Sequence, residues 1–280
     1  MPMSTENRPT PVNGIVITFF STASAVGKTL VACNMASELA HEGYRVCLAD
    51  FDLQFGDVCN YLHLEPLRTL ADVQRTMQVE GDSCRVQDFL TPYQNGDVSF
   101  SVLAAPKALE EAYNIHHDYA VRAIRKLQVQ YDYILIDMAS MFSTLNLAML
   151  DLSTIVTFLG IVDFIPTIKN MKIGMDTLKM LGYDKNKIRL VLNRSDAKTR
   201  ISLADVQKLL DEPFYHVLPN DFRAASQSLR DGVPLVLAKE HTDLGDALKA
   251  LVARYTNHTT APAETEKTRE ESSWLSRIFS

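Results

Sequence analysis

Short apolar runs alternate with longer stretches of helical periodicity along most of this 280-residue chain. Continuous apolar runs predict strands that are buried on both faces, and such runs lie at 15–20, 46–49, 98–103, 133–136, 154–159 and 188–192. Amphipathic spacing predicts helices near 29–41, 119–130, 166–181, 202–210 and 243–255. Because strands alternate with helices, we expect an α/β fold with a mostly parallel sheet and helices on both faces.

The two ends of the chain differ in pattern from the body, which we place at 14–255. Residues 1–13 hold no long apolar run, and we expect a disordered leader there. Residues 256–272 are polar with mixed charge, which is typical of a flexible linker. Residues 273–280 form a short tail, and on a helix its large apolar side chains share one arc, so the tail is predicted to be amphipathic. These side chains are Trp274, Leu275, Ile278 and Phe279.

The amphipathic tail predicts contact with the inner surface of the cell membrane, since such a segment folds when its apolar face enters a bilayer interface. Docking of the tail on the protein's own body, or on a partner protein, remains an alternative. No window approaches the roughly 18 consecutive apolar residues of a membrane span, so we expect a cytoplasmic protein that is peripheral on the membrane.

Composition narrows the function classes further. The formal net charge of −6 gives no global reason for nucleic-acid binding, so we expect no DNA partner. The four cysteines show no Cys-x-x-Cys spacing, and we expect buried, reduced thiols rather than a metal or disulfide site.

The segment 21–29, which reads STASAVGKT, lies between the first predicted strand and the first predicted helix. This order is the context of a phosphate-binding loop. In such a loop backbone N–H groups hold phosphate, Lys28 reaches the β/γ oxygens, and the Thr29 hydroxyl ligates Mg²⁺. The strict motif has Gly where this chain has Thr22, and a bare Gly-Lys-Thr also fits an ordinary helix N-terminus. The residues that we expect to bind nucleotide here are Ala25, Val26, Gly27, Lys28, Thr29 and Leu30.

Acidic residues follow two other apolar runs. Asp137 ends the run at 133–136, and Asp50 and Asp52 follow the run at 46–49. An Asp at a strand end is often only a turn former. However, the carboxyl ends of parallel strands meet at one edge of a sheet, where ligands bind in such folds. We therefore predict a nucleotide site with Mg²⁺ held by Thr29, Asp50 and Asp137.

With these motifs, the chain resembles the MinD/ParA family of deviant P-loop ATPases over roughly residues 13–255. The segment ADFDLQFGDV at 49–58 is most similar to the CpaE/TadZ branch, which positions pilus and secretion machinery. The resemblance also includes VLNR at 191–194, ISLADV at 201–206 and LPND at 218–221.

The resemblance implies an ATP-dependent switch that forms a homodimer with nucleotide at the interface and binds protein partners in a polar or envelope assembly. It implies that Lys28 and Asp52 are catalytic, with Asp52 orienting the attacking water, and that Asp137 is the Walker B acid. It also implies that Asn193 hydrogen-bonds the adenine. The base would be flanked by Pro219 and Asp221.

The phosphate-binding loop departs from the family pattern at three positions. The family has Lys-Gly-Gly-x-Gly-Lys-Thr, whose first lysine reaches the partner's phosphates, and here the aligned residues are Ala23, Ser24 and Ala25. A missing cationic finger removes charge stabilisation of the kind worth about 10³–10⁵ in rate. Substitutes could come from Lys169, Lys172 or Arg223.

We therefore expect ATP binding with weak hydrolysis of ATP to ADP and phosphate. The alternative from another class is a non-hydrolysing scaffold that uses nucleotide as a structural ligand. Within the family, a MinD-type or flagellar-number-type ATPase and a ParA-type DNA-partitioning ATPase remain open.

Overall fold

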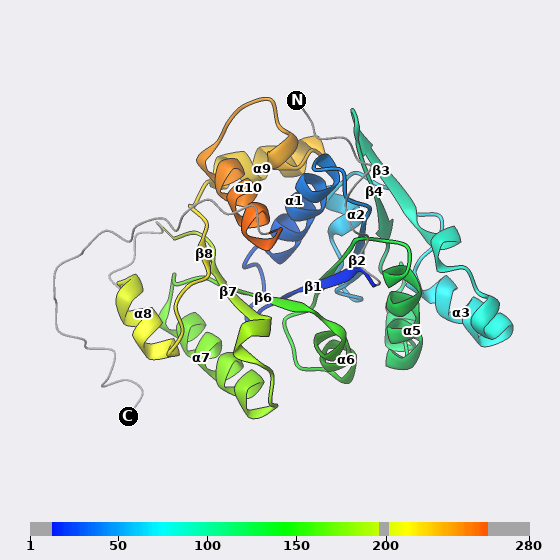
Figure 1. The fold of residues 1–280 in the computed structure, drawn as a ribbon, viewed down its shortest axis with the longest axis horizontal. Helices are drawn as coiled ribbons and strands as arrows, with labels where there is room; N and C mark the ends of the chain where they lie inside the picture. The colour runs from blue at the N-terminus through cyan, green and yellow to red at the C-terminus, as the bar shows by residue number, and fades with distance from the viewer. Residues whose placement is uncertain (1–12, 196–201, 257–280) are drawn as a thin grey trace.

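Eight strands form one sheet in this computed structural model, which describes residues 13–195 and 202–256 (Figure 1). The strand order is β3-β4-β2-β5-β1-β6-β7-β8. Only the pair β3 and β4 is antiparallel among the paired strands of the described residues, so the predicted mostly parallel sheet is confirmed. The strands are β1 Ile15–Phe20, β2 Val46–Phe51, β3 Thr91–Asn95, β4 Val98–Leu103, β5 Tyr133–Met138, β6 Ile155–Gly160, β7 Ile188–Leu192 and β8 His216–Val217.

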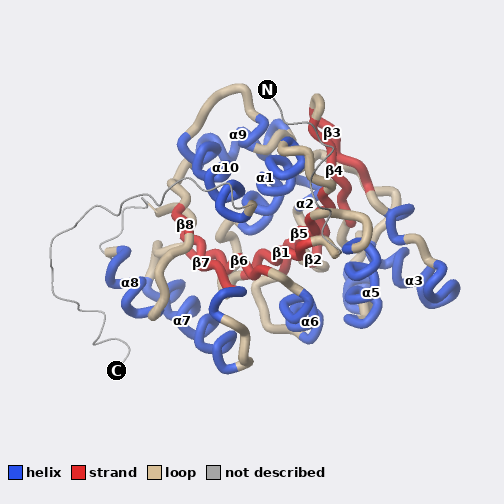
Figure 2. The backbone as a smooth tube through the Cα atoms, viewed as in Figure 1, coloured by secondary structure: helices blue, strands red, loops and turns tan. Residues whose placement is uncertain are grey.

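Helices cover both faces of the sheet, as predicted (Figure 2). One face carries α1 Lys28–His41, α2 Val58–Tyr61, α9 Phe222–Asp231 and α10 Asp243–Tyr255. The other face carries α3 Leu70–Glu80, α5 His117–Gln128, α6 Thr144–Leu152, α7 Ile165–Met180 and α8 Leu203–Leu210. Shorter helical turns are α4 Leu109–Tyr113, η2 Gly81–Ser83, η3 Val86–Phe89, η4 Lys185–Lys187 and η5 Leu235–Leu237.

The central strands contribute to two hydrophobic cores, one on each face of the sheet. In β1, Val16 and Phe20 belong to the core under α5, α6 and α7, whereas Ile17 and Phe19 belong to the core under α1 and α10. Successive side chains of a strand point to opposite faces, so a strand buried on both faces is apolar at most of its positions. This is why the continuous apolar runs predicted the strands correctly.

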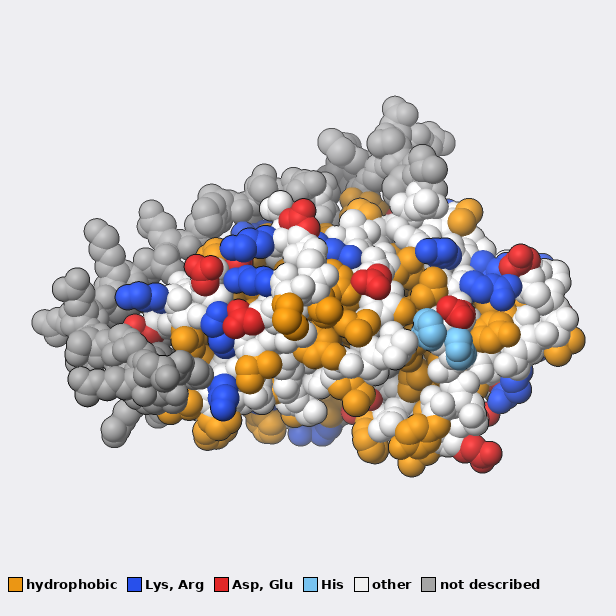
Figure 3. All heavy atoms as spheres, turned by 90° about the horizontal axis from the view of Figure 1, so that it is seen from below, with side chains coloured by type: hydrophobic (Ala, Val, Ile, Leu, Met, Phe, Trp, Pro, Cys, Tyr) orange, Lys and Arg blue, Asp and Glu red, His pale blue; other side chains and the backbone are white. Residues whose placement is uncertain are grey.

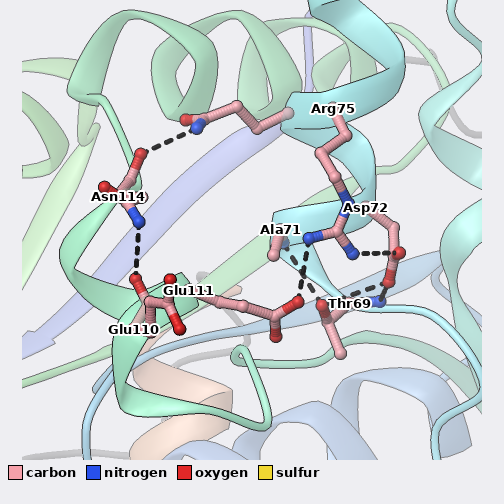
Figure 4. Close-up of polar contacts among 8 residues, drawn as sticks. Thr69, Ala71, Asp72, Arg75, Glu110, Glu111 and Asn114 are labelled. Atoms are coloured by element: carbon pink, nitrogen blue, oxygen red, sulfur yellow. Dashed lines mark hydrogen bonds and ion pairs between the residues drawn. The ribbon is translucent and has the colours of Figure 1, made fainter.

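The sequence analysis missed several peripheral elements, including β3, β8, α3, α6 and α9. Helix α3 begins at a capping box, in which Asp72 accepts from the Thr69 N–H at 2.7 Å and Thr69 Oγ1 accepts from the Ala71 N–H at 3.3 Å. Arg75 then bridges Asp72 and Glu111 at 2.6 and 2.8 Å (Figure 4). The helix also buries an apolar stripe in the core, which the sequence analysis overlooked; its members are Leu70, Val73 and Met77.

The outer surface over α5, α6 and α7 has acidic side chains among the basic ones, with apolar side chains between them (Figure 3). Within residues 13–195 and 202–256, no helix is long and apolar enough to cross a membrane. The predicted leader up to residue 12, and the predicted linker and tail from residue 257, lie outside the described residues, and so do the four apolar tail residues Trp274, Leu275, Ile278 and Phe279.

Candidate nucleotide site

The carboxyl ends of three adjacent central strands bring the predicted site together. Strand β5 lies between β1 and β2, and Asp137 is in register with Phe19 of β1 and with Asp50 of β2. The loop at 21–27 leaves β1 at the same edge and leads directly into α1. The loop and the acidic strand ends therefore lie at one edge of the sheet, as the sequence predicted.

Thr29 and Asp137 are in direct contact. The Thr29 hydroxyl donates to Asp137 Oδ2 at 2.6 Å. The other carboxylate oxygen, Oδ1, is buried and has no hydrogen-bond partner among the described residues. A hydroxyl and an unsatisfied carboxylate oxygen are the hard oxygen ligands that Mg²⁺ prefers, so these two residues fit the metal assigned to them.

The buried carboxylates of Asp50 and Asp137 form the acidic side of the site. Their negative charges are unfavourable there without a cation. Burial raises the pKa of Asp137 to about 6, although the hydrogen bond from Thr29 and the charge of Lys28 act in the opposite direction. Burial, together with the neighbouring charge of Asp137, also raises the pKa of Asp50. Two adjacent buried carboxylates repel each other, and a divalent cation would relieve that repulsion.

Asp50 lies beside Asp137, but its oxygens organise the following loop. Oδ1 accepts from the Asp52 N–H and Oδ2 from the Val58 N–H, both at 3.2 Å. A Cβ atom built on Gly56 would lie 2.4 Å from Asp50 Oδ2, so this loop closes tightly over the carboxylate. The metal role predicted for Asp50 stays a prediction, as does the catalytic role of Asp52, whose Oδ1 accepts from the backbone N–H of Phe55 at 3.4 Å.

Lys28 is held between the phosphate-binding loop and the loop after β5. Its Nζ donates to Ser140 Oγ at 2.8 Å, and Ser140 Oγ donates in turn to the carbonyl oxygen of Ala23 at 2.8 Å. The side chain of Lys28 is buried, with 8% of the residue exposed. Sequence reasoning missed Ser140, and the only signal for it was its position three residues after Asp137.

The loop contains two residues in the left-handed region, Ala25 with φ +56° and Gly27 with φ +93°. Asn193 Nδ2 donates to the Val26 carbonyl at 2.9 Å, and Arg194 donates to the Ala25 carbonyl at 3.0 Å. A left-handed conformation costs an L-residue about 1–2 kcal/mol, whereas a hydrogen bond to a charged group contributes about 1.5–3 kcal/mol. The contact with Arg194 is comparable in size to this cost, so it favours the left-handed conformation of Ala25.

The residues predicted to contact the base lie on two neighbouring strand ends. Asn193 follows β7 and Pro219 follows β8, and a backbone hydrogen bond from Ser195 to Leu218 at 3.1 Å joins the two segments. The Asn193 side chain contacts the phosphate-binding loop, and Asp221 Oδ1 accepts from the Ala224 N–H at 2.9 Å as the N-cap of α9. Contact of these residues with adenine stays a prediction.

None of the three basic residues considered as replacements for the family lysine contacts the loop at 21–27 through a hydrogen bond or ion pair. Lys172 pairs with Asp176 at 2.7 Å on α7, Lys169 is exposed on the same helix, and Arg223 is exposed on α9 beside a cavity of about 780 Å³. Among the described residues, Arg194 is the basic side chain that donates a hydrogen bond to a carbonyl of the loop. Sequence reasoning did not assign it to the site, because its approach depends on its own φ of +55°.

The sheet order, the loop that ends in Gly27, Lys28 and Thr29, and the contact between Thr29 and Asp137 define a P-loop nucleotide-binding protein. The chain belongs to the CobQ/CobB/MinD/ParA nucleotide-binding domain family, whose model matches residues 17–235. The predicted MinD/ParA membership is thus confirmed at family level.

Individual relatives agree with this assignment. The chain is 29% identical to the septum site-determining protein MinD of Helicobacter pylori over 238 residues, which are 79% of this chain and 84% of the relative. It is 32% identical to the antiactivator FleN of Pseudomonas aeruginosa over 130 residues, 46% of this chain and 44% of FleN. Among solved structures, MinD of Pyrococcus horikoshii complexed with Mg-ADP superimposes with a TM-score of 0.74 at 21% identity, covering 86% of this chain and 96% of that one.

Proposed function

We propose that this protein is an ATP-dependent dimerising switch that positions a membrane-associated assembly, namely pilus or secretion machinery as in the CpaE/TadZ branch. The observation that carries the proposal is the contact of Thr29 with Asp137 beside the buried Lys28. Together these groups provide a metal ligand pair and a phosphate-binding cation at one helix N-terminus.

Exposed apolar side chains at the same edge of the sheet support the homodimer. Phe55, Met141, Phe164 and Phe222 follow β2, β5, β6 and β8, and each is more than half exposed. Large apolar side chains gathered on one side of a molecule are typical of an interaction surface. A second copy that covered this edge would place the nucleotide at the interface.

Membrane association is assigned to the tail and would be peripheral, on the inner face of the cell membrane. A single short amphipathic segment binds a bilayer weakly, but two tails on one dimer bind far better because the second contact is intramolecular. Nucleotide would thus control membrane binding through dimer formation, and slow hydrolysis would reset both.

Hydrolysis is expected to be weak, because Ala23 stands where the family lysine would supply positive charge. In this proposal Asp52 orients the attacking water, and Lys28 stabilises charge on the transferred phosphoryl group. The assignments of Asp52 and Asp50 rest on the resemblance and on their place at the end of β2.

ATP turnover with lipid vesicles present tests the enzymatic part. The full chain should hydrolyse ATP faster than Lys28→Ala and Asp52→Ala, whereas Lys208→Ala, an exposed change on α8, should behave like the unchanged protein. Turnover of the full chain no higher than that of the two site variants would instead support the non-hydrolysing scaffold.

Vesicle flotation tests the membrane part. ATP should increase the fraction of the full chain that floats with vesicles, and removal of residues 273–280 should abolish flotation without changing nucleotide affinity. Flotation that survives this deletion would contradict the role of the tail. Salt-sensitive binding to DNA would favour the partitioning ATPase.

A second candidate is a MinD-type or FleN-type regulator, and the similarity to the Helicobacter pylori and Pseudomonas aeruginosa proteins favours it to a comparable degree. The two candidates share the switch and differ in the partner. Crosslinking in the native cell with ATP, followed by identification of the partner as a pilus, division or flagellar component, distinguishes them.

A further inference from the structure

Three carbonyl oxygens of the glycine-poor loop each accept a hydrogen bond from a side chain on another strand end. Ser140 donates to the Ala23 carbonyl at 2.8 Å, Arg194 to the Ala25 carbonyl at 3.0 Å, and Asn193 to the Val26 carbonyl at 2.9 Å. The donors follow β5 and β7, which lie on opposite sides of β1 in the sheet. The loop is therefore held from both sides.

These contacts also orient the backbone N–H groups of the loop. A peptide unit is planar and trans, so a carbonyl and the N–H of the next residue point in opposite directions. With the Ala25 carbonyl turned toward Arg194, the Val26 N–H points away from Arg194, and the Gly27 N–H likewise points away from Asn193. Phosphate-binding loops hold their ligand through such N–H groups.

Ala25 is the position in the loop that most requires an external contact. Its φ of +56° is a conformation that glycine adopts freely and that a Cβ atom disfavours. Glycine is the residue that the family resemblance places at this position. Without a restraint, the peptide after Ala25 would turn toward the ordinary right-handed region, and the Val26 N–H would turn with it.

Arg194 is itself held in place. Its φ is +55°, and its backbone N–H donates to Asn193 Oδ1 at 2.9 Å. Its guanidinium lies 4.0 Å from Oδ2 of Asp163, three residues after β6. Asp163 Oδ1 is buried with no hydrogen-bond partner among the described residues. This carboxylate therefore favours a cation at the position that Arg194 occupies.

We propose that Arg194 is a positioning residue of the nucleotide site: it holds the Ala25 carbonyl and so keeps this alanine in the conformation that glycine adopts unaided. Arg194 acts through Ala25 and not through the phosphates. The inference rests on the proposed nucleotide binding, and it explains how a loop that lacks two glycines keeps its shape.

The test is a double-mutant cycle on the full chain, with binding of a fluorescent ADP analogue and Mg²⁺ as the first readout. Arg194→Ala should weaken binding about tenfold, in line with loss of one charge-assisted hydrogen bond. In a protein that carries Ala25→Gly, the same Arg194→Ala change should weaken binding much less, because glycine adopts the loop conformation without the contact. Arg189→Ala is the matched control and should bind normally, since Arg189 lies on β7, five residues before Arg194, with its guanidinium over the Tyr215 ring at 5.0 Å.

Rescue by Ala25→Gly is the outcome that a direct contact between Arg194 and phosphate would not give. If Arg194→Ala weakens binding and Ala25→Gly does not restore it, or if Arg194→Ala binds as well as the unchanged protein, the proposal is wrong. Circular dichroism of each variant shows that it is folded.

Urea unfolding without nucleotide is the second readout, and it tests the contact between Arg194 and Ala25 independently of nucleotide binding. Without nucleotide, Ala25→Gly should stabilise the Arg194→Ala protein against urea more than it stabilises the unchanged protein. If the unchanged protein fails to bind nucleotide, the proposed function fails, yet this coupling in stability still tests the contact. Equal stabilisation in both backgrounds would overturn the positioning role.

Discussion

The two sides of the nucleotide site are built in different ways. On the acidic side, Thr29 lies on α1 and Asp137 on β5, and the two are joined by a hydrogen bond of 2.6 Å. On the loop side, residues 21–27 lack most of the expected glycines, and side chains from other strand ends hold the loop carbonyls. The predicted metal ligands lie on α1 and β5, whereas the loop conformation depends on separate contacts.

Under the proposed function, this difference explains how the loop sequence diverges from the family pattern while the site keeps its ligand. Regular strands fix the positions of side chains at their ends, so the acidic side tolerates little change. A loop conformation can be kept by glycine or by hydrogen bonds to its carbonyls, and either solution presents the same N–H groups. We therefore expect substitutions on the two sides to have separable effects.

The largest expected effect comes from restoring the missing charge on the loop side. Ala23→Lys should raise ATP turnover in the presence of vesicles by up to about 10³-fold, because a cationic finger stabilises charge that develops in the transition state. Ala23→Met, of similar length and no charge, is the control. Equal turnover of the two variants would show that the loop already has another source of charge.

A smaller effect is expected when a metal ligand is removed from the acidic side. Thr29→Val should weaken binding of ADP with Mg²⁺ about tenfold, equivalent to about 1.4 kcal/mol. Chelation of Mg²⁺ should then weaken binding less in the variant than in the unchanged protein, because the hydroxyl that would ligate the metal is gone. Fluorescence titrations with and without EDTA measure both quantities.

Thr22→Val is the matched control on the loop side. The Thr22 hydroxyl is buried with no hydrogen-bond partner among the described residues, so its loss should not reduce affinity. If chelation affected Thr29→Val and the unchanged protein to the same extent, Thr29 would not be a metal ligand.

The sequence predicted the acidic side better than the loop side for a physical reason. Strands β1, β2 and β5 are buried on both faces, so their apolar runs are continuous, and an Asp at the end of such a run is conspicuous. Their adjacency follows from the parallel arrangement. Residue order alone was therefore enough to predict that Thr29 and Asp137 lie close together.

The contacts of Ser140 and Arg194 could not be predicted in the same way. Neither residue lies in a periodic element, and the direction of Arg194 depends on a left-handed backbone that its neighbours stabilise. The edge strand β3 was missed for a related reason, since it contains Pro92 and alternates in burial rather than forming an apolar run. Local patterning carries no information about such tertiary contacts.

Stability against pH tests the acidic side without any ligand. The pKa of Asp137 is about 6 in the folded protein, above the value of about 3.9 in an unfolded chain. Between these two values the folded state holds a proton that the unfolded state has released, so stability should fall as pH rises from about 4 to about 6. At pH 7, without nucleotide or Mg²⁺, Asp137→Asn should be more stable by on the order of 2 kcal/mol.

Urea unfolding at several pH values measures this effect. In the Asp137→Asn protein, stability should fall less between pH 4 and 6 than in the unchanged protein. Asp97→Asn makes the same change in charge at an exposed turn, and its stability should fall as much as that of the unchanged protein. A less stable Asp137→Asn protein at pH 7 would mean that the carboxylate stabilises the fold, and that the acidic side is not kept for its ligand.

The smallest expected effect lies beneath the loop, at Gly174 of α7. A Cβ atom there would lie 2.3 Å from Thr22 Cγ2 and 3.1 Å from the Phe158 ring, so Gly174→Ala should push the loop. Overpacking costs about 1–3 kcal/mol, but replacing a helical glycine returns about 1 kcal/mol, which leaves a net loss of about 1 kcal/mol. Urea unfolding measures that loss, with Ile173→Ala as the exposed neighbouring control.

Because Thr22 belongs to the loop side, Gly174→Ala should lower nucleotide affinity by the same factor with and without Mg²⁺. A fall only with Mg²⁺ would show that the two sides of the site are coupled.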